Sequence, residues 1–215
     1  MGDRGVIAVL YSDPMYAATS LFGFTEFYIR YATGSHAIRR MMDHLFEQIV
    51  EDTRRKAQTC REMDVIFLTG GPEIATPPMM PPQAFAELVV PYQRMLIEII
   101  HDAGHLAMIH CHGRVRQVLD HMVETGVDAI EPIEPPPQGD ITLEELIRHT
   151  GGQLGFLGYI PDQALHTAPR GAITRHVQQI AKIVKGGSGY VMAPTCTPFQ
   201  HPVTDTFLRN YSEWM

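Results

Sequence analysis

The segment Leu106-Ala-Met-Ile-His-Cys-His-Gly113 is a short apolar run followed by three potential metal ligands and a glycine. The four apolar residues that open this run lack helical spacing, which predicts a buried strand. Alternate residues of a strand point to the same face, so we expect His110 and His112 to project together and Cys111 to point the other way. Two imidazoles on one side of a strand end could make half of a metal site. The alternative is a pair of ordinary histidines that hydrogen-bond to their neighbours.

The composition is that of a globular protein with one sizeable core. Of the 215 residues, 45% are hydrophobic and 19% are charged, and the net charge is -7. An acidic chain has no basic surface for nucleic acid or for an anionic membrane, and we expect neither as a partner. The sequence shows no apolar run of about 18 residues, as a transmembrane helix requires, and no secretory signal. Three sparse cysteines suit a reducing compartment, so a cytoplasmic protein is expected.

Strand-like and helix-like segments alternate about six times, with no linker between them. The apolar and β-branched runs predict strands at 6–11, 64–68, 106–110, 128–133, 153–159 and 190–193. Amphipathic spacing and capping residues predict helices at 15–22, 36–63, 83–103 with a break near Pro91, 115–125, 142–149 and 174–184. This alternation predicts a single α/β domain with a parallel sheet covered by helices.

Residues that could do chemistry gather where the predicted strands end. In a parallel α/β fold these carboxyl ends share one face, where active sites form. Each of the six ends carries such residues: Ser12 and Asp13, Glu73, His110 and His112, Glu131 and Glu134, Tyr159, and Cys196. The coincidence across six loops is stronger evidence for a site than any single motif.

Three glutamates are candidates for acid–base or ligand roles. Glu73 could be a fourth metal ligand or the acid that protonates a leaving group, or it could be a solvated loop residue. Glu131 and Glu134 flank Pro132, and they could line the site and orient its histidines, or simply belong to a rigid proline-rich loop.

The other candidates are expected to contact substrate. Asp13 could do so or could only cap a helix, and Tyr159 could be a wall of the pocket. Arg114, with Arg116, could grip a carboxylate or a phosphate, although arginines on helix surfaces are usually solvated. We expect Cys111 to be a buried apolar filler.

From about Phe85 to Asp205 the chain resembles the uroporphyrinogen decarboxylase superfamily, which includes cobamide-dependent methyltransferases. The segment Phe85–Tyr92 is similar to the helix motif F-x-x-x-V-x-P-Y, and Ile109–Gly113 is similar to the strand end H-x-C-G. Gly126–Ala129 and Gly189–Cys196 resemble later strands of the family, and weaker similarity extends back to the start.

The resemblance implies a (β/α)8 TIM barrel, for which about 250 residues are typical. Six βα units then predict an incomplete barrel that matches the C-terminal two-thirds of a family member, with the first one or two units missing. Either the gene is short or split, or another chain supplies the missing strands. An open sheet edge otherwise invites pairing with a second subunit, so a homodimer is the alternative.

The resemblance also implies a metal site and a reaction. By likeness to the methyltransferase branch, His110, His112 and Cys196 would hold zinc, with His112 in place of the family's usual cysteine. The decarboxylase branch has a histidine at the position of Cys196 and an arginine-rich N-terminal segment, and both are absent here. The family turn G-N-I-D-P is replaced by Gly158-Tyr-Ile-Pro-Asp162, which departs from the usual substrate contact.

The function expected from this likeness is zinc-dependent methyl transfer between a corrinoid protein and a thiol or a small methylated substrate. The alternatives are decarboxylation of a tetrapyrrole, as in porphyrin biosynthesis, and a non-catalytic barrel fragment that assembles with a fuller barrel.

Overall fold

The computed structural model describes residues 4–185, 187, 189–198 and 200–215, and they form two compact units. Unit 1 is the chain up to Cys111 together with Val115–Asp128, and unit 2 is His112–Arg114 together with Ala129–Met215. Each unit is described by itself.

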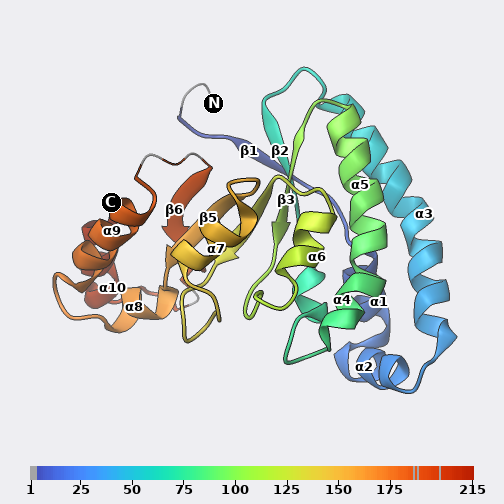
Figure 1. Cartoon of the computed structure of the whole chain (residues 1–215), viewed down its shortest axis with the longest axis horizontal. Coiled ribbons are helices and arrows are strands. Elements are labelled where there is room, and N and C mark those ends of the chain that lie inside the picture. Colours follow the sequence, from blue (N-terminus) through green and yellow to red (C-terminus); the bar gives the residue numbers. More distant parts are fainter. Residues whose placement is uncertain (1–3, 186, 188, 199) are drawn as a thin grey trace. The chain divides into compact units, whose positions relative to one another are not determined.

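Unit 1 is built on three parallel strands, β1 (Ile7–Leu10), β2 (Val65–Thr69) and β3 (Leu106–His110) (Figure 1). Ile7 is in register with Val65, and Ile66 with Leu106. The described residues of the unit also form the α-helices α1 (Pro14–Phe22), α2 (Phe24–Ala32), α3 (His36–Thr59), α4 (Pro82–Leu88), α5 (Val90–Asp102) and α6 (Leu119–Glu124), and the 3-10 helix η2 (Pro72–Ala75).

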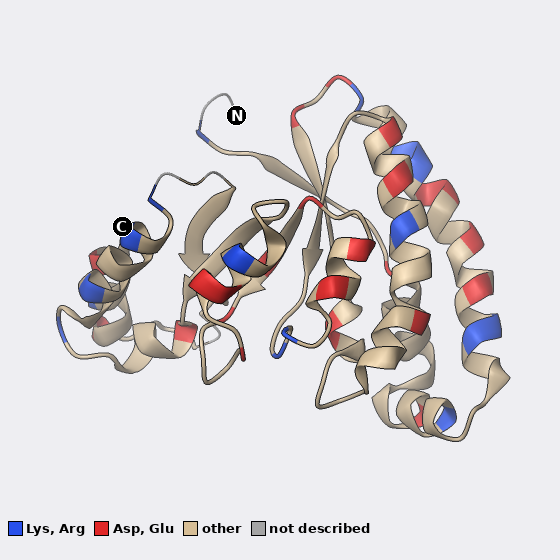
Figure 2. Cartoon of the chain, in the orientation of Figure 1, with Lys and Arg blue, Asp and Glu red and all other residues tan. Residues whose placement is uncertain are grey.

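The long helix α3 packs along α5 (Figure 1). Its buried residues, Ile38, Met42, Ile49, Thr53 and Ala57, recur at helical spacing, while charged residues line the rest of the helix (Figure 2). This is the amphipathic pattern of a helix that covers a core. The break predicted near Pro91 is confirmed, since α4 ends at Leu88 and α5 begins at Val90.

Unit 2 also has three parallel strands, β4 (Ala129–Ile133), β5 (Gly155–Ile160) and β6 (Tyr190–Pro194). Its helices are α7 (Leu143–Thr150), α8 (Asp162–Thr167), α9 (Ala172–Ile183) and α10 (Asp205–Trp214). The expected capping box is present at α7. The Thr142 hydroxyl accepts from the Glu145 N–H, and the Glu145 carboxylate accepts from the Thr142 N–H.

The six strands confirm an α/β fold of TIM-barrel type with six βα units instead of eight among the described residues. The expectation of one domain stays a prediction. Within the described ranges, no helix is long and apolar enough to cross a membrane.

Two sequence-based expectations were wrong in detail. The helices α2, α8 and α10 had no predicted counterpart. The helix expected from residue 115 begins only at Leu119, because Val115–Val118 form a turn that is closed by a hydrogen bond from the Val118 N–H to the Val115 carbonyl.

Candidate active site

Asp13 lies at the end of β1 inside the core of unit 1, where it is only 1% exposed. Its Oδ1 accepts the Tyr16 N–H at 2.8 Å and so caps α1. Its Oδ2 accepts a hydrogen bond from Gln93 Nε2 at 2.7 Å, and Gln93 Oε1 accepts the Tyr11 hydroxyl at 3.0 Å. Both oxygens of Asp13 are therefore engaged within the protein, and its capping role is observed.

Burial raises the pKa of Asp13 from 3.8 to about 6, because an ionised carboxylate loses its hydration in the core. The hydrogen bonds from Tyr16 and Gln93 oppose this rise, and the nearby charge of Glu73 adds to it. Burial likewise raises the pKa of Tyr11, and the charge of Asp13 contributes. Asp13 thus changes its charge closer to neutral pH than an ordinary aspartate does.

The pair Gly70–Gly71 brings three of the predicted site residues together in unit 1. A Cβ on Gly71 would lie 2.9 Å from Asp13 Oδ1, and the Gly71 N–H donates to Glu73 Oε2 at 2.8 Å. On the neighbouring residue, a Cβ on Gly70 would lie 3.7 Å from His110 Cδ2. Asp13, Glu73 and His110 therefore surround one short stretch of backbone just beyond β2.

In unit 2, His112 pairs with Glu134. His112 Nδ1 lies 3.3 Å from Glu134 Oε1, and the Gly113 N–H donates to Glu134 Oε2 at 2.6 Å. The Glu134 side chain is only 14% exposed, so its carboxylate is largely shielded from water where it contacts the histidine. A carboxylate on one ring nitrogen of a histidine is the usual support for a metal ligand, which would then bind through Nε2.

Cys196 is exposed and follows a firmly anchored residue at the end of β6. The Thr195 N–H donates to the Ile160 carbonyl at 2.9 Å, and the Thr195 hydroxyl accepts the Asp162 N–H at 3.1 Å. Asp162 is itself buried, and burial raises its pKa, against the opposing influence of His166. The backbone that carries the Cys196 thiol is thus fixed to the end of β5.

Tyr159 occupies a structural position in unit 2. Its hydroxyl accepts the Leu143 N–H at 3.1 Å, and its ring stacks on His176 at a centroid distance of 5.9 Å. The same ring lines a cavity of about 520 Å³ beside Pro135 and Ile180. Tyr159 therefore joins β5 to α7 and α9, and its contact with substrate stays a prediction.

The other predicted site residues are described by their exposure and their place in the strands. Arg114 is exposed, Glu131 lies half-buried within β4, and Cys111 is buried as expected. The strand β3 ends at His110, so the strand alternation that placed His110 and His112 on one face does not extend to His112.

The expected zinc ligands are divided between the units, with His110 in unit 1 and both His112 and Cys196 in unit 2. In the part of the chain that the structure describes, no three His, Cys, Asp or Glu side chains form a group that could hold a metal ion. The zinc site therefore stays a prediction. Two imidazoles and a thiolate are a donor set that zinc accepts, and the Glu134 contact suits His112 as one of these donors.

Gln93 was missed by sequence reasoning. It is fully buried and links Tyr11 to Asp13. Helical spacing could have identified it, because Gln93 lies on the same face of α5 as the buried residues Leu96, Ile97 and Ile100. A polar residue on an apolar helix face needs a buried partner.

The fold and the strand-end residues define an α/β protein of barrel type with its candidate site at the carboxyl ends of the strands. A family model described as uroporphyrinogen decarboxylase (URO-D) matches residues 3–206. The chain therefore belongs to the URO-D family. No curated protein matches the sequence.

Among solved structures, the chain is similar to a methyltransferase from Methanosarcina mazei. The TM-score is 0.75 at 17% identity, over 100% of this chain and 58% of that one. The chain thus spans less than two thirds of that methyltransferase. D-psicose 3-epimerase from Clostridium cellulolyticum H10 matches with a TM-score of 0.48 at 11% identity, over 96% of this chain and 80% of that one.

Proposed function

We propose that this chain takes part in zinc-dependent methyl transfer between a corrinoid-bearing partner protein and a thiol or small methylated substrate, in the cytoplasm. The observation that carries the proposal is the His112–Glu134 pair, because a carboxylate on Nδ1 is the setting of a metal-ligating histidine. Membership of the URO-D family and the fold shared with a methyltransferase support it.

His110, His112 and Cys196 would hold the zinc, and when bound it would lower the pKa of a thiol or water at neutral pH. Three protein ligands leave a fourth position for substrate, or for Glu73 or Glu131. Glu134 would keep His112 in the tautomer that ligates through Nε2.

Glu73 is the residue of unit 1 best suited to move a proton. Its carboxylate accepts the Gly71 N–H, which fixes its position next to the buried Asp13. When a thiol is the acceptor, this carboxylate would take its proton. A corrinoid on the partner protein would supply the methyl group, and cobalt would keep the electron pair of the cobalt–carbon bond as the sulfur–carbon bond forms. In the opposite direction, the acid would protonate the alkoxide or amine that a methyl ether or a methylamine releases when its methyl group passes to the corrinoid.

Asp13, Tyr159, Glu134 and Arg114 are the proposed substrate-binding residues. Arg114 is exposed and suits an anionic group of the substrate, such as a carboxylate or a phosphate. Asp13 would act from the interior, through the Glu73 loop. Another chain would supply the missing βα units of a full barrel, or a second copy of this chain would pair with the open sheet edge in a homodimer.

Zinc analysis together with a methyl-transfer assay tests the proposal. We expect a stoichiometric zinc in the purified protein, lost in His112→Ala and in Cys196→Ala. Cys60→Ala is the matched control, because Cys60 lies at the end of α3 in unit 1 and is not an expected ligand. With methylcobalamin and a thiol, the protein should form the thioether in step with loss of the methylcobalamin spectrum.

Two other outcomes would contradict methyl transfer. The family match favours a second candidate, decarboxylation of a tetrapyrrole, and zinc-free protein that decarboxylates uroporphyrinogen would support it. Zinc-free protein that is inactive in both assays but binds a fuller barrel would instead indicate a non-catalytic assembly partner.

A further inference from the structure

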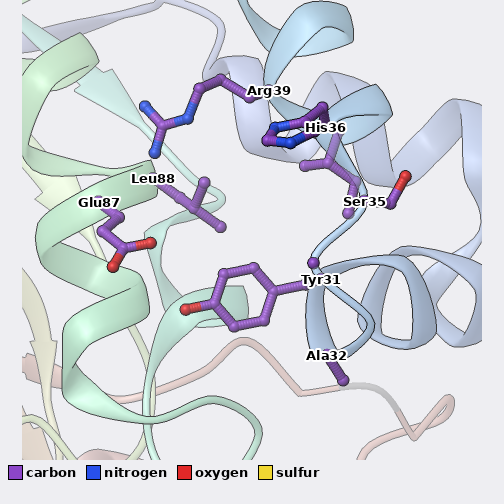
Figure 3. Close-up of a pocket in the computed structure, with 9 residues that line it drawn as sticks. Tyr31, Ala32, Ser35, His36, Arg39, Glu87 and Leu88 are labelled. Carbon is purple, nitrogen blue, oxygen red and sulfur yellow. The ribbon is translucent and has the colours of Figure 1, made fainter.

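A second candidate site lies on unit 1, lined by other residues than those of the candidate active site (Figure 3). It is a cavity of about 370 Å³ between the end of α2, the start of α3 and the end of α4. The residues that matter for its chemistry are Tyr31, Ser35, His36, Arg39, Glu87 and Leu88.

Opposite charges from two different helices face this cavity. Arg39 belongs to α3 and Glu87 belongs to α4, and both side chains are at the cavity in Figure 3. Among the residues that the structure describes, neither one forms a salt bridge or a side-chain hydrogen bond. Arg30 and Glu26, by contrast, pair at 2.7 Å on the neighbouring helix α2.

The Tyr31 hydroxyl lies within the field of both charges. Burial raises the pKa of Tyr31, the charge of Glu87 raises it further, and the charge of Arg39 opposes the rise. Tyr31 therefore adds a hydroxyl group near both charges, whereas the Ser35 hydroxyl caps α3 by accepting the Ala37 N–H. Ile38 and Leu88 also line the cavity, and both are buried, so they form an apolar floor.

A ligand with a single charge would satisfy only half of this arrangement. An anion bound to Arg39 would also meet Glu87, and a cation bound to Glu87 would also meet Arg39. A ligand that carries both charges satisfies both side chains at once, since guanidinium binds a carboxylate through two parallel hydrogen bonds and a carboxylate accepts from an ammonium group.

We propose that this cavity binds a small zwitterion of the α-amino acid class, with its carboxylate on Arg39, its ammonium group on Glu87 and an apolar side chain over Leu88. The site goes beyond methyl transfer and does not depend on zinc.

Isothermal titration calorimetry with glycine, acetate and methylammonium tests whether binding requires both charges on one ligand. Acetate carries only the anionic group of glycine, and methylammonium carries only the cationic one. We expect glycine to bind at least about tenfold more tightly than either, a difference of about 1.4 kcal/mol. L-Leucine should bind more tightly than glycine because of the apolar floor.

Variants assign the binding to this cavity. Arg39→Gln and Glu87→Gln should each weaken L-leucine binding at least about tenfold. Arg40→Gln and Glu47→Gln are matched controls, because both residues are exposed on α3 and do not line the cavity. The double reversal Arg39→Glu with Glu87→Arg should recover part of the affinity, and circular dichroism checks that each variant is folded.

Any one of three results would overturn the proposal. The first is that neither glycine nor L-leucine binds at millimolar concentrations. The second is that acetate binds as tightly as glycine, and the third is that L-leucine binds both single variants as tightly as the wild type. None of these bears on the zinc and methyl-transfer assays, which use other residues.

Discussion

Glu134 holds His112 and the residue after it at the same time, with Oε1 3.3 Å from His112 Nδ1 and Oε2 2.6 Å from the Gly113 nitrogen. One carboxylate therefore fixes both the ring and the backbone of the turn that follows β3. A negative charge beside Nδ1 favours the proton on that nitrogen, which is the tautomer found in histidines that bind a metal through Nε2.

Replacement of Glu134 by Gln should lower the affinity for zinc without unfolding the protein. The amide keeps the shape of the side chain but removes the charge that orients His112, and loss of such a partner typically costs 10- to 100-fold in metal affinity, so a loss of about that size is expected. Competition with a chromophoric chelator measures it. Glu144→Gln is the control, because Glu144 is exposed on α7. Equal zinc affinity in Glu134→Gln and the wild type would contradict the proposed role of the pair.

Asp13→Asn should stabilise the protein at neutral pH. The folded protein holds the proton of Asp13 up to about pH 6, whereas the unfolded chain releases it near 3.8. The folded state thus binds more protons in this window, so the contribution of Asp13 to stability falls as pH rises through it. Above about pH 6 the full cost is roughly 3 kcal/mol, and asparagine avoids it.

Urea unfolding across the pH range measures this difference. The variant and the wild type should have equal stability below about pH 4 and diverge up to about pH 6. Asp102→Asn removes one exposed carboxylate from the end of α5 and serves as the charge control. A stability difference that is constant with pH would show that Asp13 is not strained by burial.

Local sequence signals predicted the elements that carry the candidate site. Apolar runs placed all six strands, and Thr142 with Glu145 placed the start of α7, because these features depend on residues close together in the chain. The helix α2 was missed because it begins directly after Gly23 with no side-chain cap. The raised pKa of Asp13 results from its burial in the folded protein, and its hydrogen bond comes from Gln93, which is 80 residues away in the chain. Neither could be read from local spacing.

Gly71→Ala should destabilise unit 1 strongly. Gly71 has a φ of 129°, and a Cβ there would lie 2.7 Å from Tyr16 Cβ and 2.9 Å from Asp13 Oδ1. Backbone strain and steric overlap together should cost about 3 kcal/mol or more. Gly34→Ala is the matched control, since Gly34 has a φ of 70° but open space around a Cβ, and a cost of about 1 kcal/mol is expected. Similar unfolding midpoints for the two variants would show that the contact with Asp13 is not tight.

Thr195→Val tests the anchor of Cys196. Valine keeps the volume of the side chain but removes the oxygen that accepts the Asp162 N–H, so a buried donor loses its partner at a cost of about 1 to 2 kcal/mol. Thr167→Val is the control, because that hydroxyl is exposed on α8 and bonds only within its own helix. If the anchor also positions the thiol, Thr195→Val should weaken zinc binding while Thr167→Val leaves it unchanged. Loss of stability with unchanged zinc affinity would limit Thr195 to a structural role, because the thiol would then reach the metal without the link between β5 and β6.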